Sequence, residues 1–138
     1  MSESAEHKRI LVVDDEEDVQ ILVSRILRDA GYTVDRASDG KEAIEQLDSV
    51  PPDLIVLDLM MPGRGGFDVL KDLQAADPDI PIFVVTARAL DPSTFQMISM
   101  ESNVKGVHQK PLDMKVFNAK LHDVLGTVPP QKFENWQG

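Results

Sequence analysis

Residues 54–63 read LIVLDLMMPG. The run opens with apolar residues that do not alternate with polar ones, which is typical of a strand buried on both faces of a sheet. Asp58 ends the run directly, and the residues after it, through Pro62 and Gly63, offer no evident helix for its carboxylate to cap. Asp58 is therefore predicted to be a functional side chain at the end of an interior strand.

Further apolar runs alternate with helical patterns along the chain. The runs are residues 10–13, 32–37, 82–85 and 104–109. The helical patterns contain Val19, Leu22, Val23, Ile26 and Leu27, then Ala43, Ile44 and Leu47, then Phe67, Leu70 and Leu73. Asp91 and Pro92 are placed to start a fourth helix, and Gly126 is placed to stop a fifth. This alternation predicts a parallel sheet with helices on both faces.

Charge separates the interior strands from the edge strands. The runs at 10–13, 54–57 and 82–85 are apolar throughout, whereas the other two contain Asp35, Arg36, Lys105, His108 and Gln109. Charged residues are tolerated at sheet edges, so the predicted strand order is 2-1-3-4-5. This is a doubly wound, flavodoxin-like α/β fold, with a crevice beyond the carboxyl ends of the first and third strands.

The composition indicates one acidic domain. The 138 residues carry a formal net charge of -10. Nucleic acids and anionic membranes are bound by clustered Lys and Arg, so neither is an expected partner. The sequence has no cysteine, which excludes disulfides and thiolate metal sites. Its polar start and short apolar runs predict neither a leader nor a membrane span, so a cytoplasmic location is expected.

Polar residues stand at the ends of the predicted strands. They are Asp14 and Asp15, Asp58, Thr86, and Lys110 before Pro111. Each has an ordinary explanation alone: the paired aspartates cap a helix, Thr86 is a β-branched strand residue, and Lys110 is a solvated strand end. Carboxylates that converge on one sheet edge repel one another, and a divalent cation offsets the repulsion. Such oxygen ligands suit Mg²⁺ together with a phosphate group.

In these segments the sequence resembles the receiver domain of bacterial two-component response regulators. The resemblance covers about residues 8–126. Its segments, in the family's order, are Val12-Val13-Asp14-Asp15, Leu57-Asp58-Leu59-Met60-Met61-Pro62-Gly63, Val85-Thr86-Ala87 and Lys110-Pro111. It implies a signalling switch rather than an enzyme, one that assists its own phosphorylation and dephosphorylation. The implied partners are a sensor histidine kinase or phosphotransfer protein and an unknown downstream protein target, with the chain as a monomer or weak dimer.

The resemblance implies which residues accept the phosphoryl group and hold the metal. Asp58 takes the phosphoryl group from a phosphohistidine of the partner kinase. Asp15 and Asp58 bind Mg²⁺ directly, and Asp14 assists, often through water. The backbone carbonyl of Met60 completes the metal site.

It also implies how the phosphoryl group is sensed. Lys110 pairs with the phosphoryl oxygens, Thr86 swings in to hydrogen-bond them, and the small Ala87 leaves the site open. The bond between Lys110 and Pro111 is a cis-peptide candidate. Movement of the threonine is coupled in the family to the face of the fourth helix, fifth strand and fifth helix, which becomes a partner-binding surface.

Three features depart from the family pattern. Val107 stands where an aromatic switch residue is usual, and His108 or Phe95 are weak candidates to replace that ring. Asn103 stands where glycine is common, which predicts a left-handed backbone there. The apolar segment 89–100 is read as core packing for about half of its apolar residues, with some surface left for a partner or dimer contact.

The domain boundaries and two rival functions complete these expectations. Residues 1–7 are predicted to be a flexible N-terminus, 8–126 the receiver domain and 127–138 a tail or truncated linker. An Asp-nucleophile phosphohydrolase is one rival, but its usual acid, two residues beyond the nucleophile, would fall at Met60. An FMN-binding flavodoxin-like protein is the other, but the aspartates after the first strand would repel the FMN phosphate.

Overall fold

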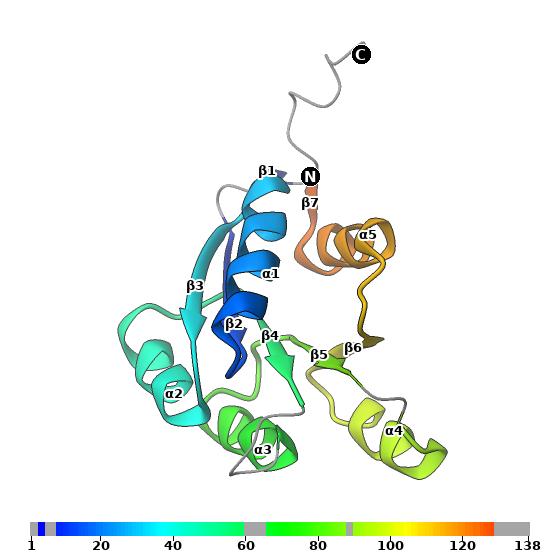
Figure 1. The fold of residues 1–138 in the computed structure, drawn as a ribbon. Coiled ribbons are helices and arrows are strands. Elements are labelled where there is room, and N and C mark those ends of the chain that lie inside the picture. Colours follow the sequence, from blue (N-terminus) through cyan, green and yellow to red (C-terminus); the bar gives the residue numbers. More distant parts are fainter. Residues whose placement is uncertain (1–2, 5–7, 60–65, 88–89, 129–138) are drawn as a thin grey trace.

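The predicted strands form one parallel sheet in a computed structural model that describes residues 3–4, 8–59, 66–87 and 90–128 (Figure 1). The strands are β2 (Arg9–Val13), β3 (Thr33–Ala37), β4 (Leu54–Asp58), β5 (Ile82–Thr86) and β6 (Val104–Gln109). Their order is β3-β2-β4-β5-β6, which confirms the predicted order 2-1-3-4-5. The helices are α1 (Glu17–Asp29), α2 (Gly40–Ser49), α3 (Gly66–Ala76), α4 (Pro92–Ser99) and α5 (Met114–Leu125). Among the described helices, none is long and apolar enough to cross a membrane.

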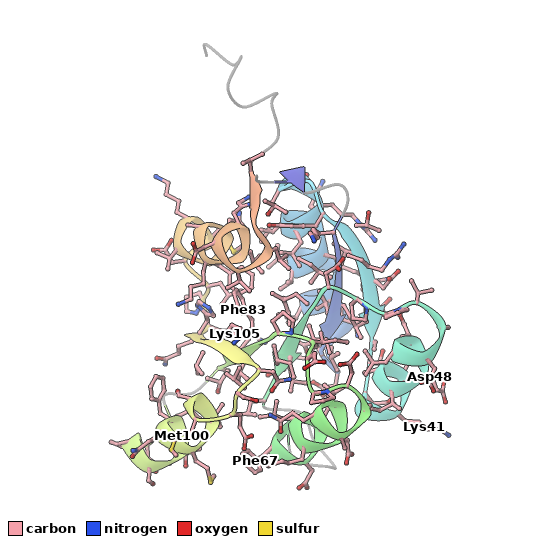
Figure 2. All side chains as sticks on the ribbon, turned by 180° about the vertical axis from the view of Figure 1, so that it is seen from behind. Lys41, Asp48, Phe67, Phe83, Met100 and Lys105 are labelled. Atoms are coloured by element: carbon pink, nitrogen blue, oxygen red, sulfur yellow. The ribbon has the colours of Figure 1, made fainter. Side chains whose placement is uncertain are left out.

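Two hydrophobic clusters hold the helices against opposite faces of the sheet. The first joins α1 and α5 to the sheet and contains Phe83 and Phe117, whose rings meet edge to face with centroids 5.7 Å apart. Figure 2 labels Phe83 within this layer. The second joins α2, α3 and α4 to the other face and contains Leu70 and Ile98. Alternate residues of β4 belong to alternate clusters, as the two-residue period of a strand requires, so the doubly wound α/β fold is confirmed.

Burial and helix ends follow the sequence closely. All residues of β4 and β5 are buried, whereas β3 and β6 contain exposed positions, which confirms the assignment of interior and edge strands. The carboxylate of Asp91 accepts a hydrogen bond from the Thr94 backbone N–H, and Pro92 begins α4. Gly126 ends α5 in the left-handed region, with φ of 67°.

The segment before β6 differs from the expectation. The predicted left-handed backbone at Asn103 is wrong, because no non-glycine residue in the described ranges has a positive φ. Instead, the buried Asn103 side chain accepts a hydrogen bond from Gln74 Nε2 at 2.7 Å and donates one to the Ile80 carbonyl at 2.9 Å. Its amide ties α3 to the segment before β5, which a glycine could not do.

A register shift in β6 decides which of its side chains face which helices. The shift against β5 falls between Ile82 and Phe83. Val107 packs against the cluster on the α4 side. His108 instead lies against Phe83 and Phe117 on the other face, with ring centroids 5.3 Å and 5.1 Å away. The ring of His108 is therefore on the opposite face of the sheet from α4.

Two short strands lie beyond the amino ends of the main strands (Figure 1). They are β1 (Glu3–Ser4) and β7 (Thr127–Val128), which pair in parallel although the sequence assigns them to a flexible N-terminus and a tail. The buried Tyr32 hydroxyl lies 2.7 Å from Thr127 Oγ1 and 3.0 Å from His122 Nδ1, which connects β7 to α5. The wider boundaries 1–7, 8–126 and 127–138 stay predictions.

The contacts of His122 predict that stability falls in acid. Burial lowers the pKa of His122 below the ordinary 6.5, so the unfolded chain binds the proton more tightly. The free energy of unfolding should therefore fall as the pH drops below about 6.5 toward the folded-state pKa. Urea unfolding of the wild type and of His122→Gln across that range measures this effect. The pH dependence should be weaker in the variant, and equal slopes would contradict the prediction.

Candidate functional site

The candidate site lies where the carboxyl ends of four strands meet. In the register of the sheet Val13 pairs with Leu57, and Asp58 pairs with Val85. Asp14 follows β2, Asp58 ends β4 and Thr86 ends β5, so the three side chains come to one edge from neighbouring strands. Their exposed fractions are 3%, 4% and 2%, so all three are buried. Parallel pairing thus brings two carboxylates and a hydroxyl group together away from bulk water.

Lys110 joins this group from the end of β6. Its Nζ lies 3.2 Å from Asp14 Oδ2 and 3.6 Å from Asp58 Oδ2. Its backbone N–H donates to the Thr86 carbonyl at 2.8 Å, which extends the pairing of β5 with β6 to the site. The peptide bond between Lys110 and Pro111 is cis. One ammonium group is therefore within ion-pair distance of both buried carboxylates.

The electrostatic balance at Asp14 is unfavourable for the ionised carboxylate. Burial raises its pKa, and the nearby Asp58 charge raises it further. The Glu16 backbone N–H, which donates to Asp14 Oδ1 at 2.9 Å, and the Lys110 ammonium act in the opposite direction. The net effect is a raised pKa, with burial as the largest cause, and one ammonium group faces two carboxylates at this edge.

The turn after β2 adds further acidic groups. Carboxylate oxygens of Asp14, Asp15 and Glu16 lie within 4.8 Å of one another, a spacing that suits a bound metal ion. Asp15 and Glu16 are exposed. Glu16 occupies the N-cap of α1 without a side-chain cap hydrogen bond, so neither aspartate serves as that N-cap. Glu16 is not among the residues predicted from the sequence, although the acidic run that contains it was the available signal.

Gln20, which is also absent from the residues predicted from the sequence, is buried beside this turn. Its position, three and seven residues before Val23 and Leu27, lies on the buried stripe of α1. The available signal was a long polar side chain on this buried stripe, which also contains the smaller polar residue Ser24. The side-chain amide donates a hydrogen bond to the backbone carbonyl of Asp14.

The remaining predicted residues occupy different surroundings. Ala87 is exposed and directly follows Thr86. Val107 is half-buried and packs on the α4 side of the sheet. It lies on the edge strand β6, whereas Asp58 ends the interior strand β4. Met60, whose backbone carbonyl is a predicted metal ligand, lies outside the described residues.

Comparison with known proteins identifies the family. Residues 10–122 match the family described as "Response regulator receiver domain", and the chain belongs to this family. The match contains every predicted site residue. It confirms the resemblance seen in the sequence and defines the chain as a receiver domain of the kind found in two-component systems.

Named relatives agree with the family match. The chain is 37% identical over 119 residues to the alkaline phosphatase synthesis transcriptional regulatory protein PhoP of Bacillus subtilis, covering 86% of the chain and 49% of the relative. It is 38% identical over 117 residues to the response regulator MprA of Mycobacterium ulcerans, covering 85% and 50%. The chain thus spans about half the length of these relatives.

Solved structures share the fold. The chemotaxis protein CheY4 of Vibrio cholerae is 31% identical with a TM-score of 0.75, and the match covers 86% of this chain and 98% of that one. The response regulator protein TrrA of Thermotoga maritima, in complex with Mg²⁺–BeF, is 31% identical with a TM-score of 0.72, covering 86% and 99%.

The charge balance at the site predicts that Asp14→Asn stabilises the metal-free protein. Because the Asp14 pKa is raised in the folded state, its stabilising effect is present in acid and is lost as the pH rises through that pKa. At neutral pH the amide should therefore increase the free energy of unfolding by about 1 kcal/mol. Urea unfolding without divalent cations measures the change. The exposed Asp15→Asn is the control and should have a smaller effect, and a destabilised Asp14→Asn would contradict the prediction.

Proposed function

We propose that this chain is a phosphoryl-accepting switch and that Asp58 is the acceptor. A carboxylate oxygen of Asp58 attacks the phosphorus of a phosphohistidine on a sensor histidine kinase or phosphotransfer protein. A phosphorus–oxygen bond forms while the phosphorus–nitrogen bond breaks. The bonding electrons return to the imidazole nitrogen, which takes up a proton from water. The products are an aspartyl phosphate and a neutral histidine.

The position of Lys110 is the observation that carries this proposal. Its ammonium lies within 3.6 Å of a carboxylate oxygen of Asp58 and closer still to Asp14. An anionic phosphoryl group meets strong repulsion at a carboxylate unless positive charge is already in place. Lys110 provides that charge before transfer and can pair with a phosphoryl oxygen afterwards by a short shift of its side chain.

The same edge of the sheet suits Mg²⁺. Asp14, Asp15 and Asp58 offer carboxylate oxygens, and the proposed backbone ligand is Met60. Oxygens of Asp14 and Asp15 lie within 4.8 Å of each other and of a Glu16 oxygen, and oxygen ligands fit a hard divalent cation. When bound, Mg²⁺ offsets negative charge on the carboxylates and on the incoming phosphoryl oxygens. The Mg²⁺–BeF complex of the Thermotoga maritima relative supports this assignment.

The proposed response begins at Thr86. Its hydroxyl would hydrogen-bond the phosphoryl group, and the small Ala87 would leave room for this movement. Val107 lies on the α4 side and has no ring to rotate, so the change would pass through repacking of an aliphatic side chain. The resulting surface comprises α4, β6 and α5, where α4 and its end expose Phe95, Met97 and Met100. Figure 2 shows Met100 at the outer edge of the molecule beside α4.

The output of the switch is a partner protein that binds this surface. The chain spans about half the length of the PhoP and MprA relatives, so the proposed function includes only the receiver role and not their complete activities. We place the receiver domain at residues 8–126 and propose a monomer or weak dimer. The phosphoryl donor is a sensor histidine kinase or a phosphotransfer protein. Because the chain is a signalling switch, it also has a downstream protein target.

Asp58→Asn should abolish phosphorylation, because an amide cannot form the acyl phosphate. The measurement is Mg²⁺-dependent labelling by a small phosphodonor, followed by mass-spectrometric mapping of the modified residue. Asp53→Asn is the matched control, because Asp53 lies at the opposite end of β4 and accepts a hydrogen bond from the Arg9 backbone. It should label like the wild type. Labelling of Asp58→Asn at the wild-type level would refute the assignment.

Lys110→Ala should separate uptake of the phosphoryl group from the response to it. Asp58 remains a nucleophile, so slower labelling should persist, while the contact between the phosphoryl group and β6 is lost. Amide hydrogen exchange in α4, β6 and α5 before and after phosphorylation measures the response. Protection should change in the wild type and stay unchanged in the variant. A wild-type exchange response in Lys110→Ala would remove Lys110 from the switch.

A further inference from the structure

Gln20 connects the acidic turn to two neighbouring strands. Its side chain is only 5% exposed. Its Nε2 lies within hydrogen-bond distance of the Asp14 carbonyl, of the Ala37 carbonyl at 3.3 Å and of Ser38 Oγ at 3.2 Å. The Asp14 backbone N–H also donates to the Ala37 carbonyl, at 3.1 Å. One buried amide therefore links α1 to the carboxyl ends of both β2 and β3.

These contacts act on the part of the chain that carries the clustered carboxylates. Asp14, Asp15 and Glu16 bring their oxygens within 4.8 Å of one another, and like charges at that spacing favour opening of the turn. Within the turn, the Glu16 N–H donates a hydrogen bond to Asp14 Oδ1. Gln20 restrains it from outside by holding the Asp14 carbonyl, which precedes Asp15 in the chain.

The chemistry of the amide suits this task. An amide nitrogen donates two hydrogen bonds and carries no charge, so it holds backbone carbonyls without neutralising the carboxylates beside them. A cation at the same place would pair with those carboxylates and compete with a metal ion. Groups behind metal ligands commonly affect metal affinity about 10- to 100-fold, because they orient the ligands.

We infer that Gln20 is a positioning residue for a divalent cation bound by the turn Asp14–Asp15. Gln20 itself does not touch the metal. It holds the backbone of the turn, so that the carboxylates are arranged before the ion arrives. The inference rests on the proposed function, since it concerns the same metal site.

Paired variants test this role. Gln20→Met keeps the length and volume of the side chain but removes its hydrogen bonds. Gln46→Met is the matched control. Gln46 lies on α2, and its Nε2 also donates to a carbonyl of β3, that of Arg36, at 2.7 Å. Calorimetric titration with Mg²⁺ gives the Kd, and thermal unfolding gives the Tm without metal.

Gln20→Met should weaken Mg²⁺ binding about tenfold, whereas Gln46→Met should bind like the wild type. A purely structural role for Gln20 would lower the Tm and leave the Kd unchanged, which would overturn the inference. If the wild type itself binds no Mg²⁺, the proposed function fails instead. The two failures are therefore distinguishable.

A measurement on the wild type covers the case in which Gln20→Met does not fold. In an NMR titration with Mg²⁺, the side-chain amide signals of Gln20 should shift with the same apparent Kd as the backbone amide of Asp15. The side-chain signals of Gln46 should stay in place. Unchanged Gln20 signals at saturating Mg²⁺ would overturn the inference.

Discussion

Parallel pairing brings the carboxyl ends of β2, β4, β5 and β6 to one edge of the sheet, and the arrangement of the site depends on that constraint. Asp14 and Asp58 reach the edge from adjacent interior strands, and Lys110 reaches it from an edge strand. Isolated carboxylates would move apart, so the register of the paired strands is what holds Asp14 and Asp58 close together. The apolar layers on both faces oppose that repulsion, since burial of one large aliphatic or aromatic side chain contributes about 1.5–3 kcal/mol.

The proposed function requires one set of residues to suit both a cation and a phosphoryl group, and the charges at this edge meet that requirement. Asp14 and Asp58 share the Lys110 ammonium, so two ionised carboxylates and one ammonium leave a net negative charge. That excess favours a divalent cation, and in the proposed function the lysine pairs with phosphoryl oxygens. The buried Gln20 adds order without adding charge. Gln20 can therefore restrain the turn without reducing the negative charge available to a cation.

The strands and the edge that carries the site could be predicted wherever a strong local pattern in the sequence had only one physical explanation. Uninterrupted apolar runs identified β4 and β5 as interior strands, and the carboxylate that ends β4 marked the site edge. The backbone at Asn103 was predicted incorrectly, because conformational preference was weighed without the hydrogen bonds that its side chain makes after folding. The β1–β7 pair has two residues in each strand, too few for a periodic pattern. The hydrogen bonds of Gln20 could not be predicted, because they depend on which backbone carbonyls lie opposite α1 in the folded chain.

The parallel pair β1–β7 lies at the amino ends of the main strands, whereas the carboxylates lie at their carboxyl ends (Figure 1). Glu3 and Val128 therefore lie at the pole remote from Asp58. A surface tether attached at Val128 would hold the protein by that pole. Immobilised protein would then present the acidic edge to solution.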